Sequence, residues 1–497
     1  MSVLSNYKKH MQEIGKLQSC LSLLHWDQRT YLPKKGSDVR AEVIGKLSKM
    51  VFQLSVCDEL GRYLEELEKK DGLTEQEKAS VRVTAKAYRR HKAVPVDVYE
   101  SFAIAQSRSE TAWESAKANS DFSAFLPHLE KMVDYARRLA DYYGYEENPY
   151  DALIEEYEPG MTFRKLQAIV EPLQAKLIGL VRVLCEEGSA PDPSCAEGRF
   201  DVERQRELSM RLLRTIGYDF DAGRLDTTVH PFTIMTGPVD IRVTTRFSET
   251  DLFSGFFSTL HEGGHALYDQ GLAKDLMWSG LDEGASYGIH ESQSRLWENM
   301  VGRSLPFWRF FLPTLSELFP EFKAVSAEDI FRAINIVRPS SIRVEADEVT
   351  YNLHIMVRLK LENALINGQV KPADLPQLWR EAMSNTLGVK PESDADGVLQ
   401  DVHWSSGLFG YFPSYMLGNL YGAQLFDRAN DEIPDLDDRM EEGDFSSLLG
   451  WLRDRIHKHG KTYDPESLVR RVTGDDLNPT HFMEYINRKF ESIYRLR

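Results

Sequence analysis

The chain has 497 residues, of which 42% are hydrophobic and 28% charged, a composition typical of a globular protein. Its formal net charge of −17 argues against nucleic acid or an anionic membrane surface as a partner. The first ten residues lack an apolar signal core, no stretch approaches transmembrane length, and the four cysteines are scattered without CxxC spacing, so we expect a cytoplasmic protein with reduced thiols.

The first part of the chain is predicted to be helical. Apolar residues recur with helical spacing on a charged background in four segments, which are residues 36–70, 75–94, 97–117 and 121–142. Residues 187–198 are rich in Gly, Pro and Ser, and they predict a surface loop.

Residues 232–247 differ from their surroundings. β-Branched and apolar residues flank Thr236-Gly237-Pro238, which predicts a short β-hairpin. An edge strand at this place could bind an extended peptide. Helices are expected to resume after residue 250 and to continue to Arg497.

The next predicted helix contains the most informative motif in the chain. Ser248 and Asp251 have the spacing of a capping box at its start. Apolar residues then recur at helical spacing as far as Leu260, and Gly271 is a plausible end. The run His261-Glu-Gly-Gly-His265 therefore lies on a helix.

This HExxH run predicts a metal site with an adjacent base. Residues i and i+4 share a helix face, so His261 and His265 can direct their imidazoles at one zinc ion, with Glu262 beside it as general base. Gly263 and Gly264 each disfavour a helix by about 1 kcal/mol relative to Ala, so another element or the substrate should approach the backbone there. The alternative interpretation is two buried histidines that only satisfy core hydrogen bonds.

A catalytic zinc site needs a third protein ligand and an open fourth position. Glu291, 26 residues after His265, is the preferred candidate, and Glu298 competes from two turns further along the same segment. Glu291 could instead be an acid that the dipole favours in the first turn of a helix.

The chain also resembles the carboxypeptidase Taq family of zinc metallocarboxypeptidases. The resemblance rests on six motifs in the family's order, which are His230-Pro-Phe232, Asp240-Ile-Arg-Val-Thr244, His261-Glu-Gly-Gly-His265, His290-Glu-Ser-Gln293, Ile342-Arg-Val-Glu-Ala-Asp347 and Gly397-Val-Leu-Gln-Asp-Val-His-Trp404. It implies that His261, His265 and Glu291 are the metal ligands.

The same resemblance implies a fold and an assembly. We expect a mainly α, saddle-like helical body with a deep substrate groove and a small β-element beside the HExxH helix, as in neurolysin and angiotensin-converting enzyme. Residues 1–497 would form a single metallocarboxypeptidase domain, with a helical part at 1–200 and a catalytic part at 201–497. The resemblance also implies a homodimer and a broad peptide specificity.

Donors to the tetrahedral intermediate are expected in the C-terminal third. Related helical peptidases place a histidine near the oxyanion and a tyrosine about a dozen residues later. That spacing points to His403 with Tyr415, in preference to Tyr411. Buried His and Tyr side chains can equally serve only core hydrogen bonds.

A carboxypeptidase must bind a free α-carboxylate, and arginine offers bidentate geometry for it. Arg343 is the first choice, with Arg242 and Arg295 behind it. Arg242 has the rival role of pairing with Asp240, and Arg343 that of pairing with Glu345, Asp347 or another internal acid.

The sequence thus predicts a metallocarboxypeptidase that binds one Zn²⁺ per subunit, with Co²⁺ as a possible substitute, and acts on peptides with a free C-terminus. Glu262, His403 and Tyr415 are the predicted catalytic residues, and Arg343, Arg242 and Tyr411 would bind substrate. The alternatives are a zinc endopeptidase or oligopeptidase on the same scaffold, and a catalytically silent peptide-binding protein. No nucleic acid or membrane partner is expected.

Overall fold

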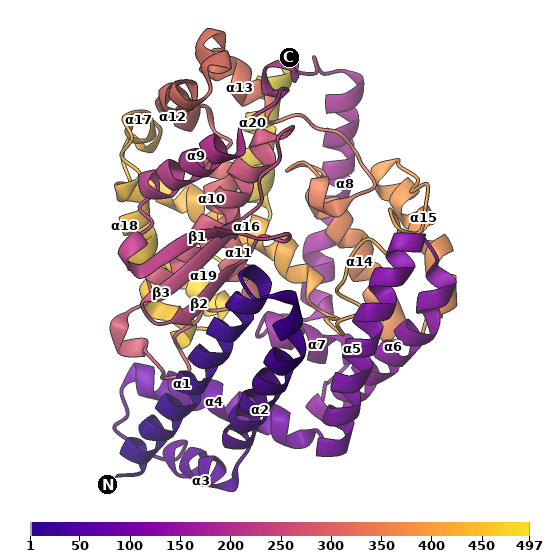
Figure 1. Cartoon of the computed structure of the whole chain (residues 1–497), viewed down its shortest axis with the longest axis vertical. Helices are drawn as coiled ribbons and strands as arrows, with labels where there is room; N and C mark the ends of the chain where they lie inside the picture. The colour runs from indigo at the N-terminus through magenta and orange to yellow at the C-terminus, as the bar shows by residue number, and fades with distance from the viewer. Residues whose placement is uncertain (1, 497) are drawn as a thin grey trace. The chain divides into compact units, whose positions relative to one another are not determined.

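The computed structural model describes residues 2–496 and is mainly helical, with one small β-sheet (Figure 1). The chain divides into two compact units. Unit 1 comprises Met1–His91, Asp192–Ile334 and Tyr421–Asp476, and unit 2 comprises Lys92–Pro191, Asn335–Leu420 and Leu477–Arg497.

Unit 1 holds the sheet and the helix that carries the HExxH run. Its elements, wholly or for the most part within the unit, are α1 (Val3–Thr30), α2 (Ser37–Ser55), α3 (Asp58–Leu67), α4 (Glu75–Ala93), α9 (Val202–Thr215), β1 (Gly223–Thr227), β2 (Thr233–Gly237), β3 (Asp240–Thr245), α10 (Leu252–Gln270), α11 (Tyr287–Arg295), α12 (Leu305–Leu318), α13 (Ala327–Ala333), α16 (Phe412–Glu432), α17 (Leu436–Glu441), α18 (Ser446–Arg455) and α19 (Pro465–Thr473).

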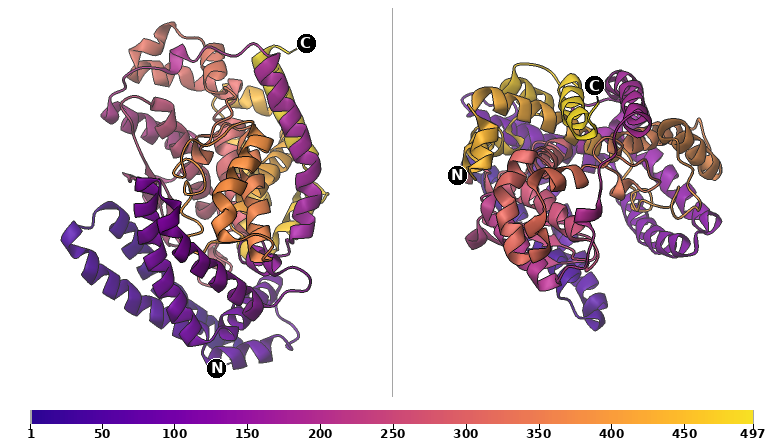
Figure 2. Two further views of the ribbon diagram at one scale, coloured as in Figure 1. Left: turned by 90° about the vertical axis from the view of Figure 1, so that its right-hand side faces the viewer. Right: turned by 90° about the horizontal axis from the view of Figure 1, so that it is seen from above.

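Unit 2 is helical. Its helices are α5 (Val96–Asn119), α6 (Phe122–Tyr143), α7 (Pro149–Tyr157), α8 (Phe163–Glu186), α14 (Tyr351–Ile366), α15 (Leu375–Leu387) and α20 (Thr480–Tyr494), and the first residues of α16 also belong to it. Helices α8 and α20 are far apart in sequence and lie side by side (Figures 1 and 2).

The predicted N-terminal helices are confirmed with one correction. Residues 36–70 form two helices, α2 and α3, because the chain becomes extended at Cys57, whose sulfur accepts a hydrogen bond from the backbone N–H of Leu60 and so caps α3. The other three segments are α4, α5 and α6. The predicted loop at 187–198 contains no α-helix.

The sheet contains the predicted hairpin and one strand that the sequence did not reveal. The strand order is β1-β3-β2, with β2 antiparallel and β1 parallel to the central β3. Ile241, Val243 and Thr245 are buried on the face of β3 that packs against α10. The segment of β1, Gly-Arg-Leu-Asp-Thr, has only one large apolar residue, so its pattern is weak.

Helix α10 forms as predicted, although its cap differs. The helix begins at Leu252, and Asp251 is the N-cap, whose side chain accepts a hydrogen bond from the N–H of Ser254. Ser248 instead forms a β-bridge with Asp251, so the predicted capping box is wrong. The helix ends at Gly271, as expected. Two of its buried aromatic side chains, Phe253 and Phe256, pack against α12, and Phe257 packs against both of them.

The prediction that helices continue from residue 250 to Arg497 needs correction in unit 2. Residues 388–411 contain no α-helix. Gly407 and Gly410 have φ values of 71° and 86°, which a right-handed helix does not allow.

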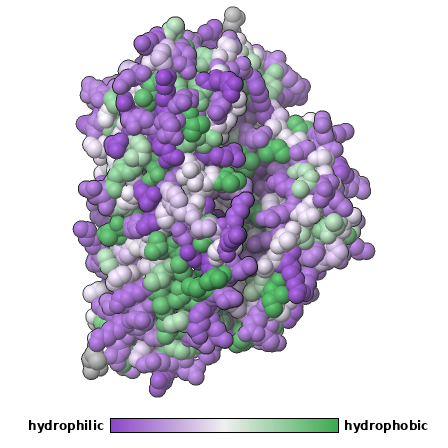
Figure 3. Space-filling view, viewed as in Figure 1, coloured by the Kyte–Doolittle hydropathy of each residue, from purple (hydrophilic) through white to green (hydrophobic). Residues whose placement is uncertain are grey.

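The surface agrees with the charged composition. On the face drawn in Figure 3, hydrophilic residues predominate and apolar residues form scattered patches. No helix within residues 2–496 has both the length and the apolar composition that a membrane crossing requires.

Candidate metal centre and catalytic residues

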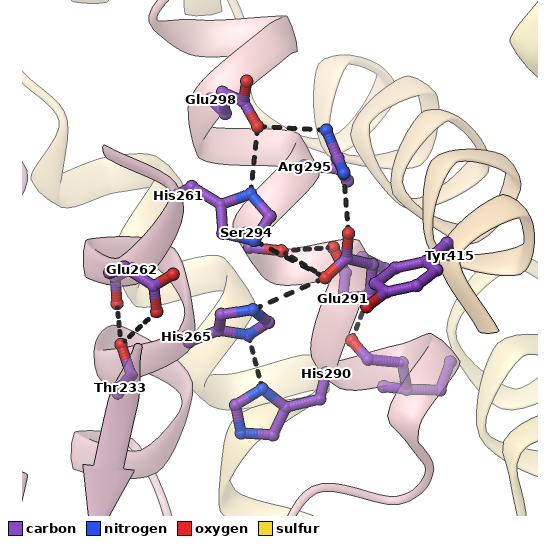
Figure 4. A network of polar contacts seen from close by, with 12 residues as sticks. Thr233, His261, Glu262, His265, His290, Glu291, Ser294, Arg295, Glu298 and Tyr415 are labelled. Carbon is purple, nitrogen blue, oxygen red and sulfur yellow. Dashed lines mark hydrogen bonds and ion pairs between the residues drawn. The ribbon is translucent and has the colours of Figure 1, made fainter. Parts of the chain in front are cut away.

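Helix α10 and helix α11 bring the three predicted metal ligands together. His261 and His265 lie one turn apart on α10, and Glu291 comes from the second turn of α11 (Figure 4). Oε2 of Glu291 lies 3.6 Å from Nε2 of His261 and 3.4 Å from Nε2 of His265. One ligand atom from each residue lies within 4.8 Å of the other two.

These residues fit a zinc ion. Ligand atoms about 2.0–2.2 Å from a tetrahedral metal are separated by about 3.4 Å, close to the two separations that involve the Glu291 oxygen. Two imidazoles and one carboxylate are also the ligand set of a catalytic zinc site, which leaves one position open.

The two glycines of the HExxH run allow close packing on both sides of α10. A Cβ at Gly264 would lie 2.6 Å from the backbone oxygen of Gln293, so α11 can approach only because glycine stands there. A Cβ at Gly263 would lie 2.8 Å from the side chain of Leu213 on α9. The expected close approach is therefore made by other elements of the chain.

Glu298, the competing candidate, contacts the predicted ligand His261. Its Oε2 lies 2.9 Å from Nδ1 of His261, the nitrogen that faces away from Glu291. Residues 296–301 form a π-helical segment, so the side chains after Arg295 do not continue the face of α11 that carries Glu291. The competitor thus orients one predicted ligand, as second-sphere acids commonly do.

Arg295 neutralises both acids. Its Nε donates to Oε1 of Glu291 at 2.7 Å, and its Nη1 donates to Oε2 of Glu298 at 3.2 Å. Burial alone would raise the pKa of Glu291, but Arg295 and the two histidines hold that pKa well below its usual range. Burial would also raise the pKa of Glu298, but Arg295 and His261 outweigh it and lower the pKa to about 2.

His265 has a supporting pair that the sequence did not reveal. Its Nδ1 lies 2.6 Å from Nδ1 of His290, and Nε2 of His290 lies 2.9 Å from Oδ1 of Asp269. If Nε2 of His265 is a metal ligand, its proton is on Nδ1 and His290 must accept it. His290 then carries its own proton on Nε2 and donates it to Asp269. The position of Asp269 four residues after His265 on α10 was a usable signal for this pair.

Glu262 is buried beside the ligands and contacts the sheet. Its exposed fraction is 8%, and its Oε2 lies 2.8 Å from the hydroxyl of Thr233 on β2. The same hydroxyl lies 2.8 Å from the backbone oxygen of Glu262, so it can donate to either acceptor (Figure 4). Thr233 was missed because a threonine in a strand has no distinctive sequence signal.

Arg242 pairs with Asp240, which is the alternative role that the sequence allowed. It forms two hydrogen bonds with the carboxylate of Asp240, at 2.9 and 2.6 Å. Its guanidinium also lies over the ring of Trp26 on α1, 4.2 Å from the centroid.

In unit 2, the predicted transition-state donors contact one another. Nε2 of His403 lies 3.1 Å from the hydroxyl of Tyr415, and the ring of Tyr411 packs against both side chains. Burial, with Arg343 nearby, lowers the pKa of His403 to about 3 despite the opposing charge of Asp401. His403 is therefore neutral at physiological pH and can donate from one nitrogen only.

Arg343 is buried in an ion-pair network of unit 2. Its Nε and Nη2 donate to Oδ1 of Asp401, and its Nη1 donates to the hydroxyl of Tyr351. Asp401 also accepts a hydrogen bond from Arg358, and Gln400 bonds both arginines. The internal acid that the sequence allowed as a partner is thus Asp401.

Known proteins of one family match this chain along nearly its whole length. The family model described as carboxypeptidase Taq (M32) metallopeptidase matches residues 6–490. The chain is 42% identical to carboxypeptidase 1 of Bacillus subtilis over 488 residues, covering 98% of this chain and 97% of that protein. It is 43% identical to thermostable carboxypeptidase 1 of Thermus thermophilus, covering 98% of each. The crystal structure of an M32 carboxypeptidase from Deinococcus radiodurans superposes with a TM-score of 0.97 at 35% identity and covers 100% of both chains.

The chain belongs to the carboxypeptidase Taq (M32) metallopeptidase family.

Membership of the M32 family confirms the predicted fold class and reaction class. The protein is a mainly α metallocarboxypeptidase, and the family implies a metal. The roles of individual residues remain predictions.

The structure groups the predicted residues of this M32 peptidase within its two units. Unit 1 brings together the predicted ligands and base, and it also holds Arg242. Unit 2 brings together the predicted transition-state donors and carboxylate anchor, which are His403, Tyr411, Tyr415 and Arg343.

Proposed function

We propose that this M32 metallocarboxypeptidase removes C-terminal residues from peptides with one zinc ion per subunit, held by His261, His265 and Glu291. The observation that supports this most is the convergence of three ligand atoms beside a buried carboxylate, that of Glu262. A zinc ion held there would polarise the scissile carbonyl and activate a water molecule.

Glu262 would act as general base. Its carboxylate accepts a proton from the attacking water and delivers it to the leaving amine. The hydroxyl of Thr233 restrains one oxygen of this carboxylate, which favours a single rotamer. Because the other oxygen has no such contact among the hydrogen bonds of residues 2–496, it is the one we assign to proton transfer.

His403 and Tyr415 would donate hydrogen bonds to the tetrahedral oxyanion. His403 is neutral, so it carries one N–H and can donate one hydrogen bond. Its Nε2 bonds the hydroxyl of Tyr415. Tyr411, whose ring packs against both, would line the substrate site.

Arg343 is our proposed anchor for the substrate α-carboxylate, with Arg242 as the second choice. Each terminal nitrogen of a guanidinium carries two N–H groups, and Asp401 and Tyr351 use one on Nη2 and one on Nη1. Arg343 also lies against the ring of Tyr415, 4.9 Å from its centroid. In unit 1, Asp240 occupies Arg242 bidentately, which makes it the weaker candidate.

We also propose that residues 1–497 act as one catalytic domain, that the protein works in the cytoplasm, and that it forms a homodimer. The family model covers nearly the whole chain, which supports the single catalytic domain. Cobalt is proposed as a substitute metal because it accepts the same nitrogen and oxygen ligands.

A peptide ladder tests this function. The zinc-loaded protein is incubated with an unblocked peptide, and the products are followed by mass spectrometry. We expect products that shorten one residue at a time from the C-terminus. No cleavage product of any kind from a metal-loaded protein would identify a silent peptide-binding protein.

An amidated peptide separates the carboxypeptidase from the endopeptidase alternative. Capping the C-terminus removes the negative charge that Arg343 is proposed to bind, so cleavage should fall sharply. Equal cleavage of the free-acid and amidated peptides would favour a zinc endopeptidase or oligopeptidase.

A further inference from the structure

Unit 2 contains a buried acid that takes no part in the proposed mechanism. Glu362 on α14 has an exposed fraction of 0%. Its carboxylate accepts hydrogen bonds from three uncharged donors, which are the hydroxyl of Tyr150 on α7 at 2.5 Å, the indole N–H of Trp404 at 2.7 Å and the backbone N–H of Gly410 at 3.1 Å.

Two of these donors stand near the two ends of one irregular segment. Residues 402–411 form turns without a helix or strand. Oε1 of Glu362 bonds Trp404 near the start of the segment, and Oε2 bonds Gly410 near its end. One side chain therefore connects both ends.

The residues next to these two contacts are the proposed functional ones. His403 precedes Trp404, and Tyr411 follows Gly410. The backbone hydrogen bonds inside the segment, such as that from the N–H of Leu408 to the oxygen of His403, do not include Gly410. The rings of His403 and Tyr411 pack against each other, and Glu362 adds one hydrogen bond at the residue next to each of them.

The end at Gly410 also packs tightly. Its φ is 86°, and a Cβ there would lie 2.7 Å from the backbone of Leu153 on α7. Helix α7 supplies the third donor as well, through Tyr150. Glu362 therefore connects α7, α14 and the segment at one buried point.

A carboxylate suits this point for a chemical reason. It offers two acceptor oxygens and no donor, so it can satisfy all three donors at once. A glutamine would present an NH₂ group to at least one of them and leave a buried donor without an acceptor.

We propose that Glu362 is a positioning residue for catalysis, which holds His403 and Tyr411 in a fixed relation by bonding both ends of residues 402–411. This inference rests on the proposed function, because it takes His403 as a donor to the transition state and Tyr411 as a residue that lines the substrate site. A purely structural role, in which Glu362 only joins α7 to α14, makes different predictions in the experiments that follow.

The first experiment compares Glu362→Gln with a matched control, Glu348→Gln. Glu348 is another buried acid of unit 2, but its partner is Lys489, at 2.6 Å. For Glu362→Gln we expect kcat on a free-acid peptide to fall at least about tenfold, since small displacements of catalytic groups have effects of this size, with KM little changed. The control should keep its kcat. A kcat loss of equal size in both variants would overturn the proposal.

Double-mutant cycles decide whether Glu362 acts through the segment. Glu362→Gln is combined with His403→Ala and, separately, with Tyr411→Phe. If Glu362 positions these groups, its substitution should change kcat by less than about twofold in at least one of the two backgrounds. Full multiplication of the effects in both backgrounds would overturn the positioning role.

Hydrogen exchange supplies a readout that needs no peptidase activity. In Glu362→Gln, peptides covering residues 402–411 should exchange faster than in the unmodified protein, because either orientation of the amide removes the acceptor of Trp404 or that of Gly410, and so loosens one end of the segment. Unchanged exchange there would overturn the proposal. If the unmodified protein releases no C-terminal residue, the proposed function fails, and the exchange still decides whether Glu362 holds the segment.

A gentler variant covers the case in which Glu362→Gln does not fold. Trp404→Phe removes one donor and keeps the carboxylate. It should lower kcat and speed exchange at residues 402–411, whereas Tyr150→Phe, which removes the donor on α7, should affect the segment less. The opposite order would overturn the proposal.

Discussion

At the scale of single residues, a substitution of Glu262 tests proton transfer without changing the predicted metal ligands. Its carboxylate contacts Thr233 and is not one of the predicted ligands, because Glu291 supplies the third ligand atom. Glu262→Gln keeps the size of the side chain and its contact with Thr233, and it removes the base. We expect kcat to fall by about 10²–10⁴-fold with the zinc content unchanged. Steady-state kinetics with metal analysis checks this, and a zinc-loaded Gln variant with normal turnover would rule out the assignment.

Asp269 is predicted to affect metal binding indirectly, through His290 and then His265. It accepts from His290, which in turn fixes the tautomer of His265. Asp269→Ala leaves all three predicted ligands in place, yet it should weaken zinc binding by up to about 10–100-fold, the range seen when the groups that orient a ligand are lost. Competition with a chromophoric chelator measures this, with Glu262→Gln as the variant whose affinity should stay normal. Equal affinity in Asp269→Ala would contradict the tautomer argument.

Glu362 should also make stability depend on pH. Burial raises its pKa from 4.5 to about 7, against the hydrogen bonds from Tyr150, Gly410 and Trp404 and the charge of Arg358. Between these values the folded protein keeps a proton that the unfolded chain has released, so the free energy of unfolding falls as the pH rises. The loss is up to about 3 kcal/mol, because each pKa unit corresponds to about 1.4 kcal/mol.

Urea unfolding of the unmodified protein and of Glu362→Gln at pH 5, 6, 7 and 8 isolates this contribution. The stability of the unmodified protein relative to the variant should decrease as the pH rises toward 8. An identical pH slope in the two proteins would show that Glu362 does not titrate in this range.

At the scale of elements, the packing of α10 against α11 sets the geometry of the ligands. Both ligand-bearing faces approach each other at Gly264, where a Cβ would meet the backbone of Gln293 and Ser294. Backbone cannot move aside as a flexible side chain can, so an added methyl group must separate the helices.

Gly264→Ala should therefore lower the free energy of unfolding by about 1–3 kcal/mol, the usual range for overpacking. Gly450 in α18 provides the matched control, since it is exposed and a Cβ there would meet no atom within 4 Å. Gly450→Ala should stabilise the protein by up to about 1 kcal/mol through helix propensity. Chemical denaturation compares the two, and stabilisation by both substitutions would contradict the packing argument.

At the scale of the whole molecule, the metal should stabilise the fold through unit 1. All three predicted ligands belong to that unit, and two elements that are consecutive in sequence supply them. A metal that binds only the folded state adds about 2.7 kcal/mol when its concentration is 100 times its Kd.

Removal of zinc by a chelator should therefore lower the thermal midpoint, and added zinc should restore it. In His261→Ala the midpoint should hardly respond to zinc, because one ligand is missing. Scanning calorimetry with and without chelator makes the comparison. If zinc leaves the thermal midpoint of the unmodified protein unchanged, this result would argue against these three residues as metal ligands.

The sequence by itself determined the class of the protein. The i, i+4 spacing of His261 and His265 specifies a shared helix face, and the apolar periodicity before them specifies the helix, because both depend on local backbone geometry. Glu291 was preferred over Glu298 by its place near a helix start and by the family's motif, and the structure places Glu291 beside the two histidines. The hairpin at 232–247 was equally local.

Only the tertiary structure decided the supporting contacts. The contact of Thr233 with Glu262 and the bonds of Glu362 to Trp404 and Gly410 join residues that lie far apart in the chain and that no local pattern pairs. Strand β1 was missed for the same reason, since its partner β3 lies beyond β2 in the chain. Local patterns follow from the helix and strand repeats, whereas partners across the fold follow from packing, which no short stretch of sequence encodes.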